Sequence, residues 1–155
     1  MCYTKEQIKT AVKSKGYKWF EDNSNKSYDV NIVGVRNTSP SVYKKVTNVF
    51  DDCLTISFKD EKGVWQFYCW ANTTDPGKKG VRNFQNSKGI ARLVAGQYRG
   101  VYSISLHSGK YQALCQRLGN VTVYRDKNRD LVYDQVVKDT GMFGINIHKA
   151  GHDST

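Results

Sequence analysis

The sequence predicts a mainly β fold (α+β): a β-sandwich or barrel of about seven to nine short strands, preceded by one short N-terminal helix. Helical periodicity is confined to the first residues, and from about residue 28 onward apolar residues alternate with period two. Polar turns separate the alternating runs. At 155 residues the chain is long enough to bury a core, so we expect one domain over residues 1–155.

The helix is expected over residues 4–15. Thr4 and Gln7 have the spacing of a capping box, in which each side chain bonds the other residue's backbone N–H. Ile8 and Val12 form a narrow apolar stripe, and Gly16 is a natural C-terminal cap.

The β-rich body is expected over residues 28–148. The first strand is YDVNIVGVRN, with Val30, Ile32 and Gly34 on one face. A hairpin follows over residues 53–70, in which Leu54, Ile56 and Phe58 alternate and KDEKG turns the chain. We expect NTTDPGKKG, residues 72–80, to be a loop.

The second half of the body predicts further short strands. Residues 89–106 contain two of them, separated at Gly96 and Gly100. Residues 120–137 predict a second hairpin with its tip at RDKNRD, and MFGINIH, residues 142–148, predicts the last strand. Residues 149–155 are expected to be a tail.

The charge of the chain is strongly positive. There are 24 Lys and Arg against 14 Asp and Glu, which gives a net charge of +10 and a pI near 9.5. This excess favours polyanionic partners such as nucleic acid, the bacterial cell wall or an anionic membrane, although solubility alone can also explain it. No run approaches the ~18 apolar residues of a membrane span, and the first residues lack the apolar core of a secretory signal peptide.

The four cysteines are far apart and form no CxxC pair, which argues against a zinc ribbon and against a dense disulfide framework. Cys53, Cys69 and Cys115 lie within apolar runs, so we expect three buried, inert thiols. Reduced cysteines indicate folding in a cytoplasm.

No metal or cofactor is expected. Asp126, Asn128 and Asp130 have the spacing of a calcium loop, but Leu131 stands where that loop needs Gly and Val137 where it needs Glu. A solvated hairpin tip explains the same residues.

The three histidines do not predict a metal site either. His148 and His152 are four residues apart, but they follow a strand pattern rather than a helix, and His107 is distant in sequence.

Aromatic residues are interleaved with polar ones in GVWQFYCWA and GQYRGVYS. Such a pattern is found on surfaces that stack on sugars or bases, and also in cross-strand core pairs.

The segment FGINIHKAG, residues 143–151, resembles the first half of the catalytic signature of the L,D-transpeptidase superfamily. In those cysteine enzymes a strand ends in an Ile-His pair, and a Ser-x-Gly-Cys segment with the nucleophile follows. The order of segments from Tyr28 to Gly151 is similar to that of phage-encoded relatives. The resemblance implies that His148 is the catalytic base. We also name Asn146, His107 and Tyr111 as candidate binding residues.

The sequence departs from that family after His148, because no Ser-x-Gly-Cys segment follows and all four cysteines precede it. Three explanations stay open: the chain is C-terminally truncated, it is an inactive relative, or another polypeptide contributes the cysteine. Whether it is an enzyme is therefore left uncertain.

The function expected from the resemblance is that of a peptidoglycan-directed, phage-encoded L,D-transpeptidase or peptidase-like domain. The first alternative is a non-catalytic virion or cell-wall-binding module of the same fold. The second is a basic nucleic-acid-binding domain, which charge and aromatics alone support. Expected partners are peptidoglycan or another anionic envelope polymer and virion proteins. The protein would be made in the cytoplasm and act at the cell wall after lysis or within a virion.

Overall fold

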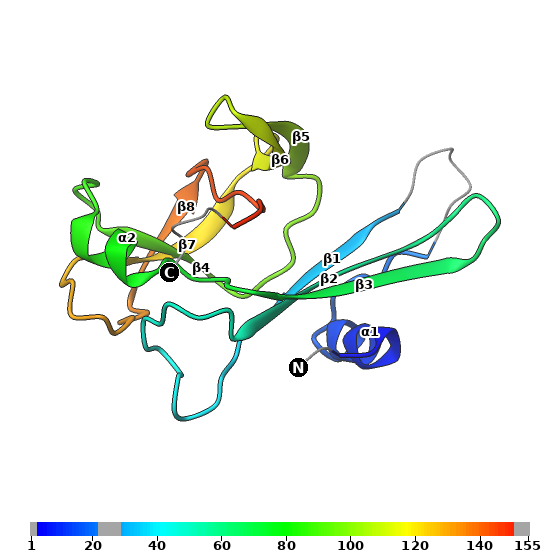
Figure 1. Ribbon diagram of the computed structural model, residues 1–155, viewed down its shortest axis with the longest axis horizontal. Coiled ribbons are helices and arrows are strands. Elements are labelled where there is room, and N and C mark those ends of the chain that lie inside the picture. The colour runs from blue at the N-terminus through cyan, green and yellow to red at the C-terminus, as the bar shows by residue number, and fades with distance from the viewer. Residues whose placement is uncertain (1–2, 22–28, 151–155) are drawn as a thin grey trace. The chain divides into compact units, whose positions relative to one another are not determined.

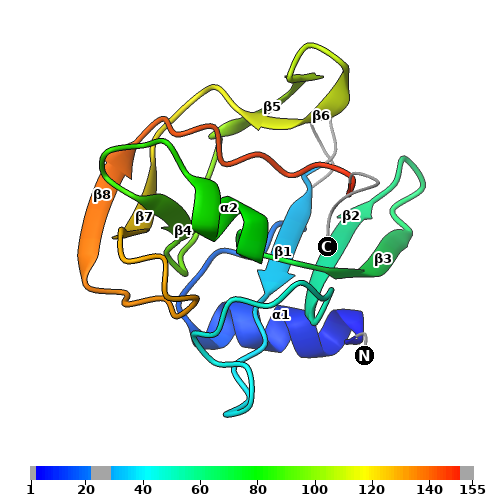
Figure 2. The same ribbon diagram turned by 60° about the vertical axis from the view of Figure 1, so that its left-hand side comes forward.

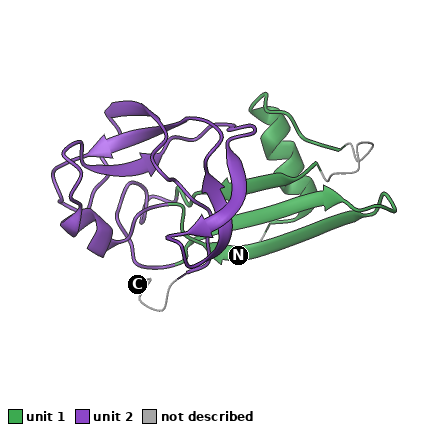
Figure 3. Ribbon diagram, turned by 90° about the horizontal axis from the view of Figure 1, so that it is seen from above, with its two compact units in different colours: residues 1–38, 50–74 green, residues 39–49, 75–155 purple. Residues whose placement is uncertain are grey.

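The computed structural model describes residues 3–21 and 29–150, and it confirms a mainly β fold (Figure 1). Eight strands form three antiparallel sheets, and none of the sheets formed by these residues closes into a barrel. The chain divides into two compact units, which we describe separately: unit 1 comprises Met1–Thr38 and Phe50–Thr74, and unit 2 comprises Ser39–Val49 and Asp75–Thr155 (Figure 3). No helix in the described ranges is long and apolar enough to cross a membrane.

Unit 1 consists of one helix and one sheet. The sheet has the strand order β1-β2-β3, and α1 lies against one of its faces (Figure 1). The elements are α1 (Lys5–Ser14), β1 (Asn31–Val35), β2 (Asp52–Lys59) and β3 (Trp65–Asn72).

The predicted helix is confirmed, with bounds one residue shorter at each end. Thr4 is the N-cap and completes the capping box with Gln7, since the backbone N–H of each is bonded by the other's side chain. Ile8 and Val12 are buried on the apolar stripe and form a core with Trp19. The helix is therefore stabilised both at its end and along its inner face.

The two faces of the unit 1 sheet differ. In the register, Val33 lies opposite Thr55, and Thr55 lies opposite Cys69, so these three side chains share a face. This face carries the residues that pack against α1: Val33, Val35, Trp65 and Phe67. The even-numbered residues of β2 and β3 point to the other face, which has no helix of unit 1 on it.

Unit 2 contains two sheets and one short helix. One sheet has the order β4-β7-β8 (Figure 2), and the other is the hairpin β5-β6. Val101, Val121 and Val123 form its main core, with Phe143 and Ile145 packed against them. The elements are α2 (Lys78–Asn83), β4 (Ile90–Leu93), β5 (Tyr102–His107), β6 (Tyr111–Gln116), β7 (Val121–Asp126) and β8 (Val137–Gly141).

The predicted loop over residues 72–80 was wrong for its last three residues, because α2 begins at Lys78. The sequence of this helix has no apolar periodicity from which it could be predicted. It forms because Val81, 1% exposed, packs against Val46 and Tyr133 in a second core cluster. Tertiary packing therefore outweighs the turn signal of the preceding residues.

The second hairpin was predicted with too short a connection. Its return strand is β8, which begins only at Val137. Arg129, Leu131 and Gln135 all have positive φ, a conformation that cannot continue a β ladder. The residues between the strands are therefore an irregular loop, joined to the rest of unit 2 by an isolated bridge between Val132 and Lys45.

The predicted last strand, residues 142–148, is not a regular strand. Gly144 has φ +69°, which interrupts an extended backbone, and only Ile147 forms a β-bridge, with Leu114 of β6. This segment is nevertheless fixed by side-chain hydrogen bonds, as the site below shows.

The expectation of three buried thiols is confirmed for Cys53 and Cys115, which are 3% and 0% exposed. It is wrong for Cys69, which is half-buried and disulfide-bonded. The pattern of an apolar run could not reveal this, because it does not indicate which cysteines the fold brings together; the Sγ atoms of Cys69 and Cys53 lie 3.1 Å apart across β2 and β3.

We expect Cys53 and Cys115 to resist maleimide in the native protein and to react after denaturation, since a buried thiol is not accessible to the reagent. Mass spectrometry of the two peptides measures this. Ser87→Cys, at an exposed loop position, is the positive control and should be labelled at once. Rapid native labelling of Cys53 or Cys115 would contradict the burial described above.

Candidate functional site

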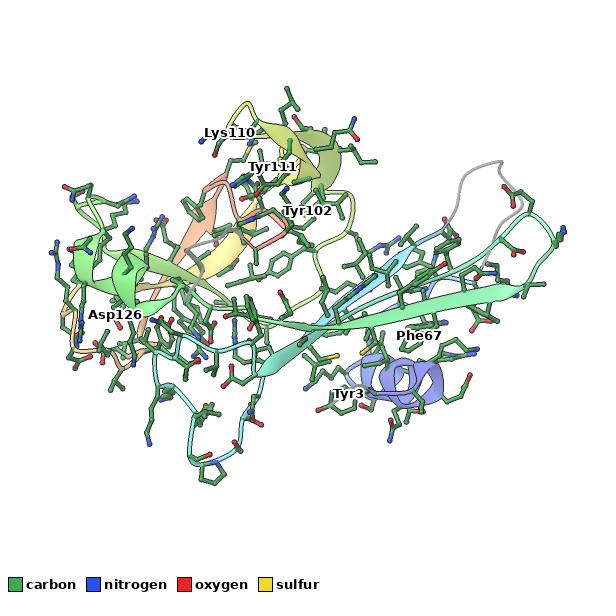
Figure 4. All side chains as sticks on the ribbon, in the orientation of Figure 1. Tyr3, Phe67, Tyr102, Lys110, Tyr111 and Asp126 are labelled. Atoms are coloured by element: carbon green, nitrogen blue, oxygen red, sulfur yellow. The ribbon has the colours of Figure 1, made fainter. Side chains whose placement is uncertain are left out.

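The β5-β6 hairpin positions the first two candidate residues. His107 ends β5 and Tyr111 begins β6, and the register places them opposite each other across the turn. Ser108 and Gly109 in that turn have positive φ, which allows the tight reversal. The rings of His107 and Tyr111 are 5.4 Å apart between centroids. Figure 4 labels Tyr111 on this hairpin, next to Lys110.

The C-terminal segment positions the other two candidate residues, Asn146 and His148. Leu114 and Ile147 exchange two backbone hydrogen bonds, of 3.0 and 2.8 Å. Because side chains alternate along an extended backbone, Asn146 and His148 lie on the face opposite to Ile147. That is the face of β6 that carries Tyr111. The structure thus brings together all four residues named from the sequence: His107, Tyr111, Asn146 and His148.

His148 is exposed and its ring is held from one side. The imidazole stacks on His107 with 4.2 Å between centroids and 14° between planes. Nδ1 is 2.8 Å from the backbone oxygen of Lys149 and 3.1 Å from the Tyr111 hydroxyl oxygen. A carbonyl oxygen can only accept, so Nδ1 carries the proton and donates it. In the neutral ring the lone pair is then on Nε2, which forms no hydrogen bond with any described residue.

Asn146 fixes the neighbouring His107. The side-chain oxygen of Asn146 accepts from the backbone N–H of Gln116 at 2.9 Å, which determines the orientation of its amide. Its Nδ2 therefore donates to Nδ1 of His107 at 3.1 Å. His107 accordingly has its proton on Nε2, the opposite tautomer to that of His148.

Burial lowers the pKa of His107 below its usual 6.5, and the nearby charges of His148 and Arg117 lower it further. Lys149 adds positive charge to the cluster, with its Nζ 4.9 Å from the centre of the Tyr111 ring. The cluster therefore favours a neutral imidazole at position 107 near neutral pH.

Gln116 was missed from the sequence, and it holds the cluster's C-terminal segment in place. It is 0% exposed. Its Nε2 donates to the carbonyls of Gly119 and Gly141, both at 2.9 Å. Its Oε1 accepts from the N–H groups of Phe143 and Ile145, both at 3.1 Å. The sequence shows only a polar residue at the end of an apolar run, with no signal for these partners.

No group of three His, Cys, Asp or Glu in residues 3–21 and 29–150 is placed to hold a metal. The calcium-like tip is internally bonded instead: Asn128 Nδ2 donates to Asp130 and to Asp134, both at 3.1 Å. His152 lies outside the described residues.

The described residues of unit 2 bring no thiol to His148. Cys115 is fully buried in β6, and its Sγ is 3.7 Å from the backbone oxygen of Ser105. Cys53 is buried in unit 1. A nucleophilic cysteine for His148 would have to come from outside these residues.

Unit 2 also contains a basic pocket of about 500 Å³. The side chain of Arg125 is 6% exposed and lies 3.3 Å from Asp139, which also pairs with Lys88 at 3.1 Å. Lys88 first, and then Arg125, lower the pKa of Asp139. Lys127 and Lys138 add further positive charge to the lining. The pocket can therefore take an anionic group.

No protein-family model, curated protein or solved structure matches the chain.

We expect the stability of the protein to fall as the pH drops below about 6.5, because the unfolded chain then binds a proton at His107 that the folded chain does not. NMR titration of the imidazoles and urea unfolding at several pH values measure both quantities. His148→Ala should raise the pKa of His107 without restoring its usual value, since burial remains. A pKa of His107 at or above 6.5 in the native protein would contradict the cluster.

Gln116→Leu should lower the free energy of unfolding by about 3 kcal/mol, because it leaves buried backbone groups unpaired. Urea unfolding measures the loss, and NMR should show the signals of His107 and His148 shifting together. The matched control is Gln112→Leu, at an exposed position of the same strand, for which we expect a change within about 0.5 kcal/mol. Equal effects of the two changes would refute the role of Gln116.

Proposed function

We propose that the chain is a peptidoglycan-directed domain of the L,D-transpeptidase or peptidase type, in which His148 is the catalytic base. The observation that carries the proposal is the state of its ring. Nδ1 is engaged by Lys149 and Tyr111, so in the neutral form of this exposed side chain the lone pair is on Nε2. A general base needs such a free lone pair on a fixed ring.

The proposed reaction is cysteine chemistry on stem peptides. Nε2 of His148 takes the proton of a thiol, the thiolate attacks a peptide carbonyl, and the C–N bond breaks as His148 returns the proton to the leaving amine. Water or an acceptor amine then attacks the resulting thioester and regenerates the thiol. By the resemblance, the thiol belongs to a Ser-x-Gly-Cys turn whose backbone N–H groups stabilise the oxyanion. In this role His107 and Asn146 position the base, and Tyr111 shares its Nδ1 proton.

The charge of the molecule supports an anionic envelope polymer as the partner. The net charge is +10, and the pocket lined by Lys88, Arg125, Lys127 and Lys138 offers one place where an anionic group could bind. In this proposal the phage-encoded protein is made in the cytoplasm and reaches the wall after lysis or as part of a virion.

A second candidate is a non-catalytic virion or wall-binding module of the same fold. The observation that favours it is that both free thiols of the described residues are buried. Binding of nucleic acid is the third candidate, and a steep loss of affinity with salt would mark it.

The test is release of peptides from purified peptidoglycan by the gene product isolated from its natural source, followed by mass spectrometry. His148→Ala should leave the fold intact and reduce release by roughly 10²–10⁴-fold, the usual contribution of a general base. Gln112→Ala, at an exposed position of β6 on the face that does not carry Tyr111, is the control and should retain activity.

Two results would decide against the catalytic proposal. Unchanged release by His148→Ala would show that His148 is not the base. A natural product that binds peptidoglycan but releases nothing would support the non-catalytic module instead.

A further inference from the structure

The open face of the unit 1 sheet carries two exposed aromatic residues. Tyr68 and Trp70 are two residues apart on β3 and are each 47% exposed. Their rings are nearly parallel, with 10° between planes and 5.8 Å between centroids. The pair therefore presents flat apolar surface to solvent from a regular strand.

These two side chains are not part of the unit 1 core. That core uses the other face of β3, where Trp65 and Phe67 pack against Ile8, Val12 and Trp19. Trp19 and Trp65 lie 5.8 Å apart within it. Alternate residues of a strand point to opposite faces. The odd-numbered aromatic residues of β3 are therefore packed in the core, and the even-numbered ones are exposed.

The residues that flank the pair on its face of β3 are amides, and two carboxylates adjoin them: Asp60 accepts from Gln66 Nε2 at 2.9 Å, and Asp52 lies opposite Asn72. Gln66 and Asn72 flank Tyr68 and Trp70 on the same face of β3, and both are half-buried. Across the ladder the partners of Gln66, Tyr68 and Trp70 are Phe58, Ile56 and Leu54. Aromatic faces with amides at either end therefore form one stripe, which we call the β3 stripe: Gln66, Tyr68, Trp70 and Asn72.

We propose that the β3 stripe binds a glycan of N-acetylated amino sugars. The C–H face of a pyranose ring is apolar and slightly positive, so it stacks on the negative face of an aromatic ring. Because Gln66 Nε2 donates to Asp60 at 2.9 Å, the amide of Asn72 is the group of the stripe that can donate to the hydroxyl and acetamido oxygens of the sugar, and the amide oxygens of both residues can accept. That this glycan is the backbone of peptidoglycan rests on the proposed function. The stacking itself does not.

The charge distribution favours a glycan over single-stranded nucleic acid. Bases also stack on aromatic rings, but nucleic-acid sites combine stacking with cations that follow the phosphates. The stripe and its cross-strand partners contain no Lys or Arg. Lys5 and Lys59 instead lie over Trp65, on the helix-covered face.

The experiment is titration of the whole chain with a soluble chito-oligosaccharide, followed by calorimetry and tryptophan fluorescence. Trp70→Ala and Tyr68→Ala should each weaken binding about tenfold or more, because each removes one stacking surface. Trp70→Phe keeps a ring and should retain part of the affinity. The matched control is Tyr43→Ala, since Tyr43 is also 47% exposed but lies in unit 2.

Circular dichroism checks that the two alanine variants are folded. If both folded variants bind the chito-oligosaccharide with unchanged affinity, the proposal is overturned. Absence of chito-oligosaccharide binding, with oligothymidine bound through Trp70, would overturn it in favour of nucleic acid. His148→Ala should bind the sugar with normal affinity. The sugar site can therefore be confirmed even if His148 is not a catalytic base. Binding of the oligosaccharide but not of purified peptidoglycan would retain the sugar site and refute the proposed function.

Discussion

The organisation of the candidate site depends on the buried side chain of Gln116. Its amide bonds four backbone groups, on Gly119, Gly141, Phe143 and Ile145. Gly141 is the last residue of the β7–β8 ladder, whereas Gly119 lies in the turn after β6, and Phe143 and Ile145 lie in the C-terminal segment, outside the named strands. One side chain thus replaces the backbone pairing that a regular strand would have provided. A buried amide is tolerated because all of its partners are present.

A small number of contacts also explains why the side chain of His148 is exposed and yet has a fixed ring orientation. Ile147 forms the bridge to Leu114, and Asn146 uses its amide to join the backbone of Gln116 to the ring of His107. The stacking of His107 and His148 then adds a second surface of contact. The cluster is assembled from short contacts made by neighbouring residues, while the Nε2 of His148 stays accessible.

Unit 1 shows how one strand serves two purposes. The odd-numbered residues Trp65 and Phe67 of β3 stabilise the unit by packing on α1, and the even-numbered Tyr68 and Trp70 remain at the surface. Burying all four would require a second layer on the sheet. In this sheet the period of the strand therefore divides the aromatic residues of one segment between the core and the exposed face.

The sequence by itself determined the class of fold, the N-terminal helix and the first hairpin, because these depend on local periodicity and on the capping contact of Thr4 and Gln7. It also singled out His148, through the resemblance of residues 143–151. Only the tertiary structure decided that His107, Tyr111 and Asn146 meet His148, that α2 forms around Val81, and that the C-terminal segment is held by Gln116. The physical reason is that these features depend on contacts between residues about 30 or more positions apart, to which local propensity contributes little.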